Sequence, residues 1–181
     1  LQVLIMTITL GSTGSLPTTR YLLFWRYFDT IFNREADKDT TLRAFFRDHR
    51  EDITELHKVV GLALQIDCET TGEVRARLPR ARLQRIALAM MRDNEHPDTD
   101  AQKYANTVYT VATQRLVLLC TDEGDTVSFD VRSLQELMAG CALTDGTDNE
   151  IRFNLNATAR SAHWRNSWLF AAGRLFSINR Y

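Results

Sequence analysis

Twelve residues in the middle of the chain, VRARLPRARLQR at positions 74–85, hold five arginines and no acidic residue. Guanidinium groups donate hydrogen bonds in a planar fork that matches the oxygens of phosphate groups. Alternation predicts a short strand over residues 73–79, and helical periodicity follows over residues 80–92. Both elements place arginines opposite their apolar faces. We therefore predict a phosphate-binding surface made of Arg75, Arg77, Arg82, Arg85 and Arg92.

A second basic block closes the sequence. Residues 151–181 hold five arginines and no acid, interleaved with tryptophan, phenylalanine and tyrosine. Bases of single-stranded nucleic acids stack on aromatic rings while guanidinium groups follow the backbone. This block therefore predicts further contacts with nucleic acid, through Arg160, Arg165 and Arg174.

Other interpretations of both blocks stay open. Trp164, Trp168, Ala171 and Leu175 recur at helical spacing, which is typical of a helix packed on the core. The arginines of residues 75–92 could pair with the acids of residues 93–150, or with an acidic surface of a protein partner.

Patterns for catalysis and metal binding are weak. The acidic loops TDEGDT and TDGTDNE do not follow the twelve-residue calcium-loop spacing. The four histidines lack metal-ligand spacing, and Cys68, Cys120 and Cys141 form no CxxC pair. We predict that the protein is not an enzyme and has no catalytic, cofactor-binding or metal-binding residues. A catalytic site assembled from scattered residues is the alternative.

Charge is sharply divided along the sequence, although the formal net charge of the 181 residues is only −1. Residues 73–92 carry +5, residues 93–150 carry −9 and residues 151–181 carry +5. Such segregation suits a subunit whose basic face meets the acidic face of the next copy.

Periodicity predicts an α+β fold that is mostly α-helical. Residues 1–15 are expected to form an extended N-terminal arm, with a strand over 1–10 and a flexible link. Residues 16–181 are expected to form a single compact domain.

Helices are predicted from Thr18 or Thr19 to about residue 33, and from Thr40 or Thr41 after a polar loop at 33–39. Further helices are expected over residues 51–66, 80–92, 99–114 and 132–140, and around the tryptophans. Gly140 is expected to end the helix over 132–140. A β-hairpin is expected within residues 115–131, and a last strand over 151–155.

The first ten residues, LQVLIMTITL, are apolar but too short to span a bilayer, and they lack the basic flank of a signal peptide. We expect no membrane association and reduced cysteines, hence a location inside the cell or within an assembled particle.

These features together favour a structural assembly subunit of the capsid or nucleoprotein type, which self-associates and contacts RNA or DNA phosphates. One alternative is a monomeric regulatory or protein-binding module. Another is a winged-helix-like DNA-binding domain, because three helices over 51–66, 80–92 and 99–114 precede a hairpin. The scarcity of cationic residues in the third of these helices counts against it.

Overall fold

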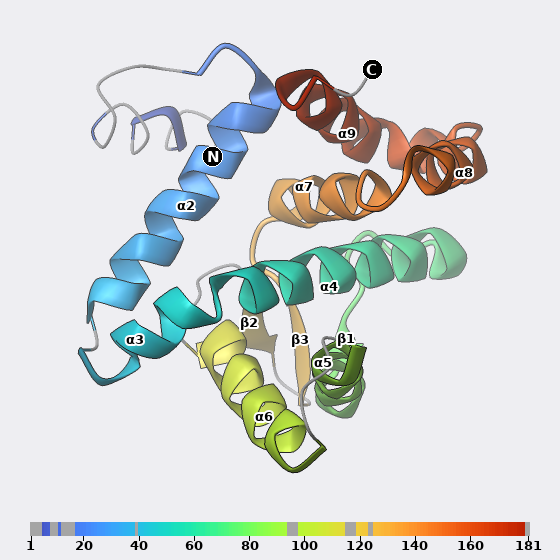
Figure 1. Cartoon of the computed structure of the whole chain (residues 1–181). Helices are drawn as coiled ribbons and strands as arrows, with labels where there is room; N and C mark the ends of the chain where they lie inside the picture. The colour runs from blue at the N-terminus through green and yellow to red at the C-terminus, as the bar shows by residue number, and fades with distance from the viewer. Residues whose placement is uncertain are drawn as a thin grey trace.

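One long helix runs through the middle of the molecule and is shared by two groups of smaller elements. The computed structural model describes residues 5–7, 11, 17–38, 40–93, 98–114, 119–122 and 125–179. Helix α4 (Arg50–Thr71) crosses the centre of Figure 1, with the sheet on one side and α7 and α9 on the other. The predicted α+β, mostly helical, single compact domain is confirmed.

Helix α4 forms where helical periodicity predicts it and extends further. Acidic Glu51 and Asp52 occupy its first turn, where the helix macrodipole favours negative charge. It ends before Gly72, whose backbone N–H donates to the carbonyl of Cys68 at 3.0 Å. Its fully buried apolar side chains recur at helical spacing: Ile53, Leu56, Val60 and Leu64.

The sheet has three short antiparallel strands in the order β1-β3-β2. Strand β1 (Leu78–Pro79) is the part of the predicted strand over 73–79 that pairs with a neighbour. Strands β2 (Leu119–Asp122) and β3 (Thr126–Phe129) form the predicted hairpin, whose tip at residues 123–124 lies outside the described residues. Pro79 lies on an edge strand, where its missing N–H costs least.

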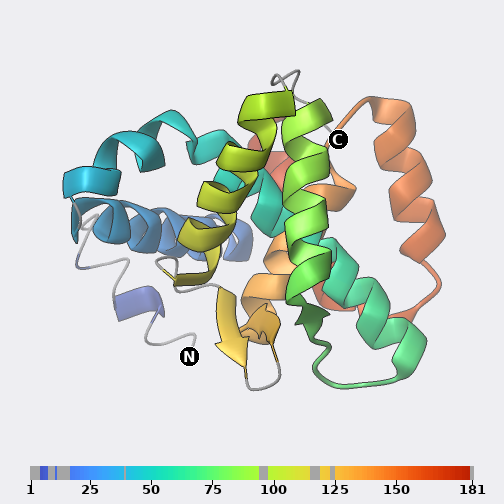
Figure 2. The same cartoon turned by 90° about the horizontal axis from the view of Figure 1, so that it is seen from below.

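Two helices cover the sheet side of α4. Helix α5 (Arg80–Asp93) and helix α6 (Asp98–Gln114) pack side by side in front of α4 in Figure 2, and both confirm the predicted helices. Their inward faces are apolar. The fully buried positions are Leu83, Ala87, Met91, Ala101 and Val108.

The remaining described elements are all helical. They are α2 (Arg20–Lys38), α3 (Thr40–Asp48), α7 (Arg132–Leu143), α8 (Asp148–Thr158), the 3-10 turn η1 (Ala162–Trp164) and α9 (Arg165–Ser177). Thr19 caps α2, because its Oγ1 accepts the backbone N–H of Leu22 at 3.2 Å. Thr19 is one of the two predicted starts of this helix, the other being Thr18.

Several predicted boundaries are wrong. The polar segment over 33–39 continues α2 as far as Lys38, because Glu35 accepts hydrogen bonds from Arg34 and Lys38 on the helix. Gly140 does not end α7. It lies inside the helix, where an added Cβ would stand 2.6 Å from the carbonyl oxygen of Ser167.

The predicted strand over 151–155 is instead the middle of α8. Thr147 accepts the backbone N–H of Glu150, while the Glu150 carboxylate accepts the N–H of Thr147 at 2.7 Å. This capping box satisfies two backbone donors and starts a helix directly after the acidic loop. The T-x-x-E signature was present in the sequence and outweighs the short alternation that follows it.

The predicted N-terminal strand is not found where the structure can test it. Residues 5–7 are helical, and Ile5 is fully buried in the core. Apart from these residues and Gly11, the predicted arm and link over 1–15 lie outside the described residues. In the described ranges, no helix has both the length and the apolarity that a membrane crossing requires. Cys68, Cys120 and Cys141 are free.

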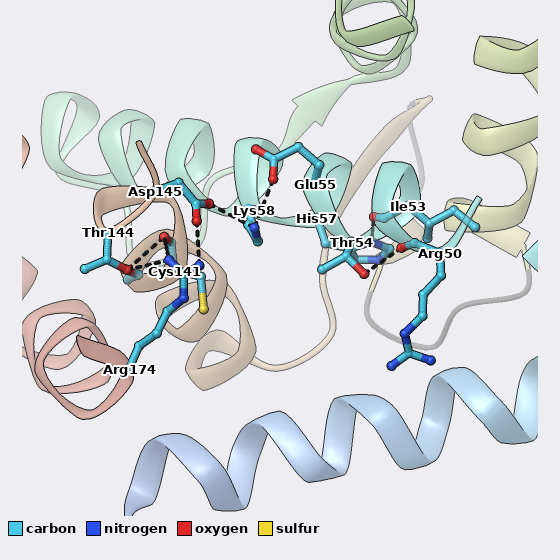
Figure 3. Close-up of polar contacts among 11 residues, drawn as sticks. Arg50, Ile53, Thr54, Glu55, His57, Lys58, Cys141, Thr144, Asp145 and Arg174 are labelled. Atoms are coloured by element: carbon cyan, nitrogen blue, oxygen red, sulfur yellow. Dashed lines mark hydrogen bonds and ion pairs between the residues drawn. The ribbon is translucent and has the colours of Figure 1, made fainter. Parts of the chain in front are cut away.

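A chain of charges joins α4, α7 and α9 (Figure 3). Asp145 accepts a hydrogen bond from Lys58 Nζ at 2.9 Å and one from Arg174 Nη2 at 2.6 Å. Arg174 Nη1 also donates to the carbonyl of Cys141 and the hydroxyl of Thr144, both at 2.7 Å. Burial lowers the pKa of Lys58, but the bonds to Asp145 outweigh it, so the net pKa is raised. Both cations therefore stay charged and hold the three helices together.

His57 is the buried titratable group at the junction of the two sides. Its ring lies 5.9 Å from that of Phe28 on α2 and 6.2 Å from that of Phe129 on β3. Nδ1 donates to the Ile53 carbonyl at 2.7 Å, and Nε2 is buried without a hydrogen-bond partner in the described part of the chain. Burial lowers the pKa of His57 to about 4.

Acidification should therefore destabilise the fold through His57. Its pKa is about 6.5 in the unfolded chain, so between pH 6.5 and 4 only the unfolded chain binds the proton. The free energy of unfolding should fall by about 2 kcal/mol between pH 7.5 and 5, as measured by urea denaturation. His57→Leu should remove most of this dependence, and a variant with the same pH slope would contradict the assignment.

Candidate nucleic-acid interface

The structure separates the arginines of the first basic block by their contacts. Arg75 Nη2 donates to the Ser128 hydroxyl at 3.0 Å and to the Phe129 carbonyl at 3.2 Å. Arg82 pairs with Asp67 of α4 at 2.6 Å. These two predicted phosphate ligands therefore tie the segment to the sheet and to α4. The contacts are internal, but their partners are not the acids of residues 93–150 that the alternative interpretation expected.

The other predicted arginines of this block lie on the surface. Arg77, Arg85 and Arg92 are exposed. Arg85 makes no hydrogen bond or ion pair with any residue that the structure describes. Arg80, which was not among the predicted ligands, pairs with Asp125 at 3.3 Å and lies over the ring of Tyr109. Arg85 is thus the member of the block best placed to meet an external anion.

The C-terminal block is divided in the same way. Arg174 is half-buried in the charge network around Asp145 and serves the fold. Arg160 and Arg165 are exposed, and neither has an ion pair within the described ranges. The eight predicted ligands therefore do not form one continuous site.

The tryptophans of this block belong mainly to the core. Trp164 is 2% exposed, and its indole N–H donates to the Glu69 carboxylate at 2.7 Å. Trp168 is partly buried, and its indole N–H donates to the Thr158 hydroxyl at 3.0 Å. Because both donors are used inside the protein, the core interpretation of the aromatic stripe holds, and base stacking on these rings is disfavoured.

The acidic loops serve the fold in the described residues. Asp145 is held by two cations, Glu150 completes the α8 capping box, and Asp125 pairs with Arg80. Among the described residues, no group of three His, Cys, Asp or Glu side chains has the geometry of a metal site.

A polar surface that sequence reasoning overlooked lies on α6. The side chains of Gln102, Lys103, Asn106 and Thr110 are exposed. Gln102 Nε2 donates to Asn106 Oδ1 at 3.3 Å, which holds the two amides together on one face. Asn and Gln amides read adenine through paired hydrogen bonds, and a lysine contacts phosphate or guanine. The α6 face therefore presents groups of the types that contact base edges, without an arginine.

This face could have been found from the sequence. The buried positions Ala101, Ala105 and Val108 define the inner side of α6, so the outer side follows from helical geometry. A search for arginine clusters passes over it because its members are mostly neutral.

No protein-family model matches the chain, and no curated protein or solved structure is detectably similar to it. Its function must therefore be inferred from the geometry of its own residues.

The division between structural and exposed arginines can be tested by stability. Arg75→Met removes the hydrogen bonds from this guanidinium to the sheet and should lower the free energy of unfolding by about 1 kcal/mol. Arg85→Met removes no such contact and should change it by less than about 0.5 kcal/mol. Equal losses in urea denaturation would contradict the distinction.

Proposed function

We propose that this protein binds duplex DNA through a winged helix-turn-helix unit, with α6 in the major groove. The observation that carries the proposal is the element order α4-β1-α5-α6-β2-β3 together with the sheet order β1-β3-β2. A strand that follows the first helix and pairs with the later hairpin is the arrangement of a winged helix, in which the third helix reads the groove.

The packing supports this assignment. Helices α5 and α6 lie against one another and against α4, with the hairpin beside them (Figure 2). The inner faces of both helices are apolar and buried. The outer face of α6 presents two amides and one lysine, which are groups that contact base edges and phosphates in a major groove.

The charges around α6 indicate which elements meet phosphates. Lys103 on α6 and Arg85 on α5 are exposed cations. The hairpin turn instead has the acidic sequence TDEGD at 121–125, which phosphates repel. We therefore expect the two helices, and not the hairpin, to provide the DNA contacts.

In this proposal the main nucleic-acid contact is the exposed face of α6, and not the clustered arginines. Self-association into a particle remains a prediction from charge segregation alone. Light scattering after size exclusion at low and high salt tests it. Assemblies that shrink as salt rises would support it, and a 20.8 kDa monomer at both salts would contradict it.

DNA binding should show two separable contributions, measured by fluorescence anisotropy and by selection from a random duplex pool. Asn106→Ala should relax the selected sequence, at a cost of about 1–3 kcal/mol for the preferred site, and leave the salt dependence unchanged. Arg85→Gln should weaken all duplexes alike and reduce the salt slope by about 0.9.

The matched control is Arg152→Gln on α8, because Arg152 is also exposed and has no ion pair within the described residues. It should leave affinity and salt slope unchanged. If the wild type selects no sequence, or if Asn106→Ala and Arg152→Gln behave alike, the proposal is wrong.

A further inference from the structure

A polar cleft of about 710 Å³ lies among α2, α7 and α9. Three arginines line it, Arg20, Arg132 and Arg165, and each is the first residue of its helix. Helices whose first residues are Arg20, Arg132 and Arg165, far apart in sequence, thus bring three guanidinium groups to one hollow.

The cleft carries an excess of positive charge that the fold does not neutralise. The helix macrodipole favours acids at helix starts, yet none of these three helices has an acid in its first turn. Helices α7 and α9 also lack a side-chain cap. Among the described lining residues, Glu136 is the single carboxylate against three guanidiniums. Positive charge at a helix N-terminus opposes the macrodipole, and a bound anion would offset this.

Glu136 orients one of the three arginines. Its carboxylate is 4% exposed and accepts Arg132 Nε at 3.2 Å and Asn166 Nδ2 at 3.1 Å. Arg132 Nη1 also donates a hydrogen bond to the Val74 carbonyl at 3.5 Å. Arg132 is therefore held at the wall of the cleft by contacts on two sides.

The other two arginines keep donors that no described residue accepts. The guanidinium carbon of Arg20 lies 4.8 Å from the centre of the Phe170 ring and 5.6 Å from that of Phe24. These rings position the guanidinium without accepting its N–H groups in hydrogen bonds. Its Nε is buried with no hydrogen-bond partner among the described residues. Arg165 is exposed without an ion pair to any described residue.

We propose that this cleft binds a small phosphorylated anion, such as pyrophosphate or the diphosphate group of a nucleotide. Its volume falls within the range of small-molecule sites, and guanidinium forks bind phosphate oxygens in pairs. The site is separate from the α6 face, since α7 and α9 lie across α4 from α6 in Figure 1. It does not rest on the proposed DNA binding.

Isothermal titration calorimetry on the full chain, with pyrophosphate and with ADP as probes at low salt, tests the assignment. The wild type should bind one equivalent saturably. Arg165→Gln should weaken binding at least about tenfold, because it removes charge-assisted hydrogen bonds without breaking a contact within the described fold. Arg20→Gln should weaken it similarly, and Arg152→Gln should leave affinity unchanged within about twofold.

Absence of saturable binding in the wild type, or unchanged affinity in both cleft variants, would overturn the proposal. A titration with duplex DNA distinguishes a small phosphorylated ligand from the phosphates of a DNA backbone. Arg165→Gln should leave the salt slope for DNA unchanged if the ligand is a small molecule. A reduced slope, with pyrophosphate binding unaffected, would assign the cleft to the DNA backbone and contradict the small-ligand site.

Discussion

The close approach of α4 to α7 is the contact on which the rest of the structure depends. An added Cβ on Gly61 would stand 2.7 Å from Met138 Cβ and 3.1 Å from the Ala139 nitrogen, so only glycine admits this spacing. Gln135 of α7 donates to Gln65 of α4 at 3.0 Å in the buried interface. If the helices shifted, these buried amides would lose their hydrogen bond, so the pair fixes the register of α4 against α7.

Helix α4 has a second set of neighbours on its other side. There it packs on α5 and α6, which lie beside the sheet. Since one rigid helix serves both sides, the α6 face and the arginine cleft are held in a fixed relation. Lys58, Asp145 and Arg174 reinforce the α7–α9 side with hydrogen bonds between 2.6 and 2.9 Å. The same helix that builds the core therefore positions both proposed binding surfaces.

Sequence reasoning located the elements with strong periodicity and failed where local signals competed. The helices around residues 53–64, 83–91 and 101–108 follow from apolar spacing, because burial dictates it. The strand predicted over 151–155 failed because five alternating residues weigh less than the capping box at Thr147 and Glu150. Gly140 resembled a helix end because close packing against Ser167 is a tertiary contact that no local pattern records.

The candidate sites were less predictable than the fold, for a physical reason. Arginine density marks where guanidinium groups occur but not what they bind. Arg75, Arg82 and Arg174 are used by the sheet, α4 and the Asp145 network. The cleft joins arginines from helices far apart in sequence, so it exists only in three dimensions. The α6 face is mostly neutral and gives no charge signal.

The most direct test of DNA binding by α6 is an NMR titration of the protein with a selected duplex, following backbone amide shifts residue by residue. If α6 enters the major groove, the largest changes should fall on Gln102, Lys103, Asn106 and Thr110, with smaller changes near Arg85 on α5. Changes concentrated on α8 and α9 instead, or none at saturating DNA, would contradict it.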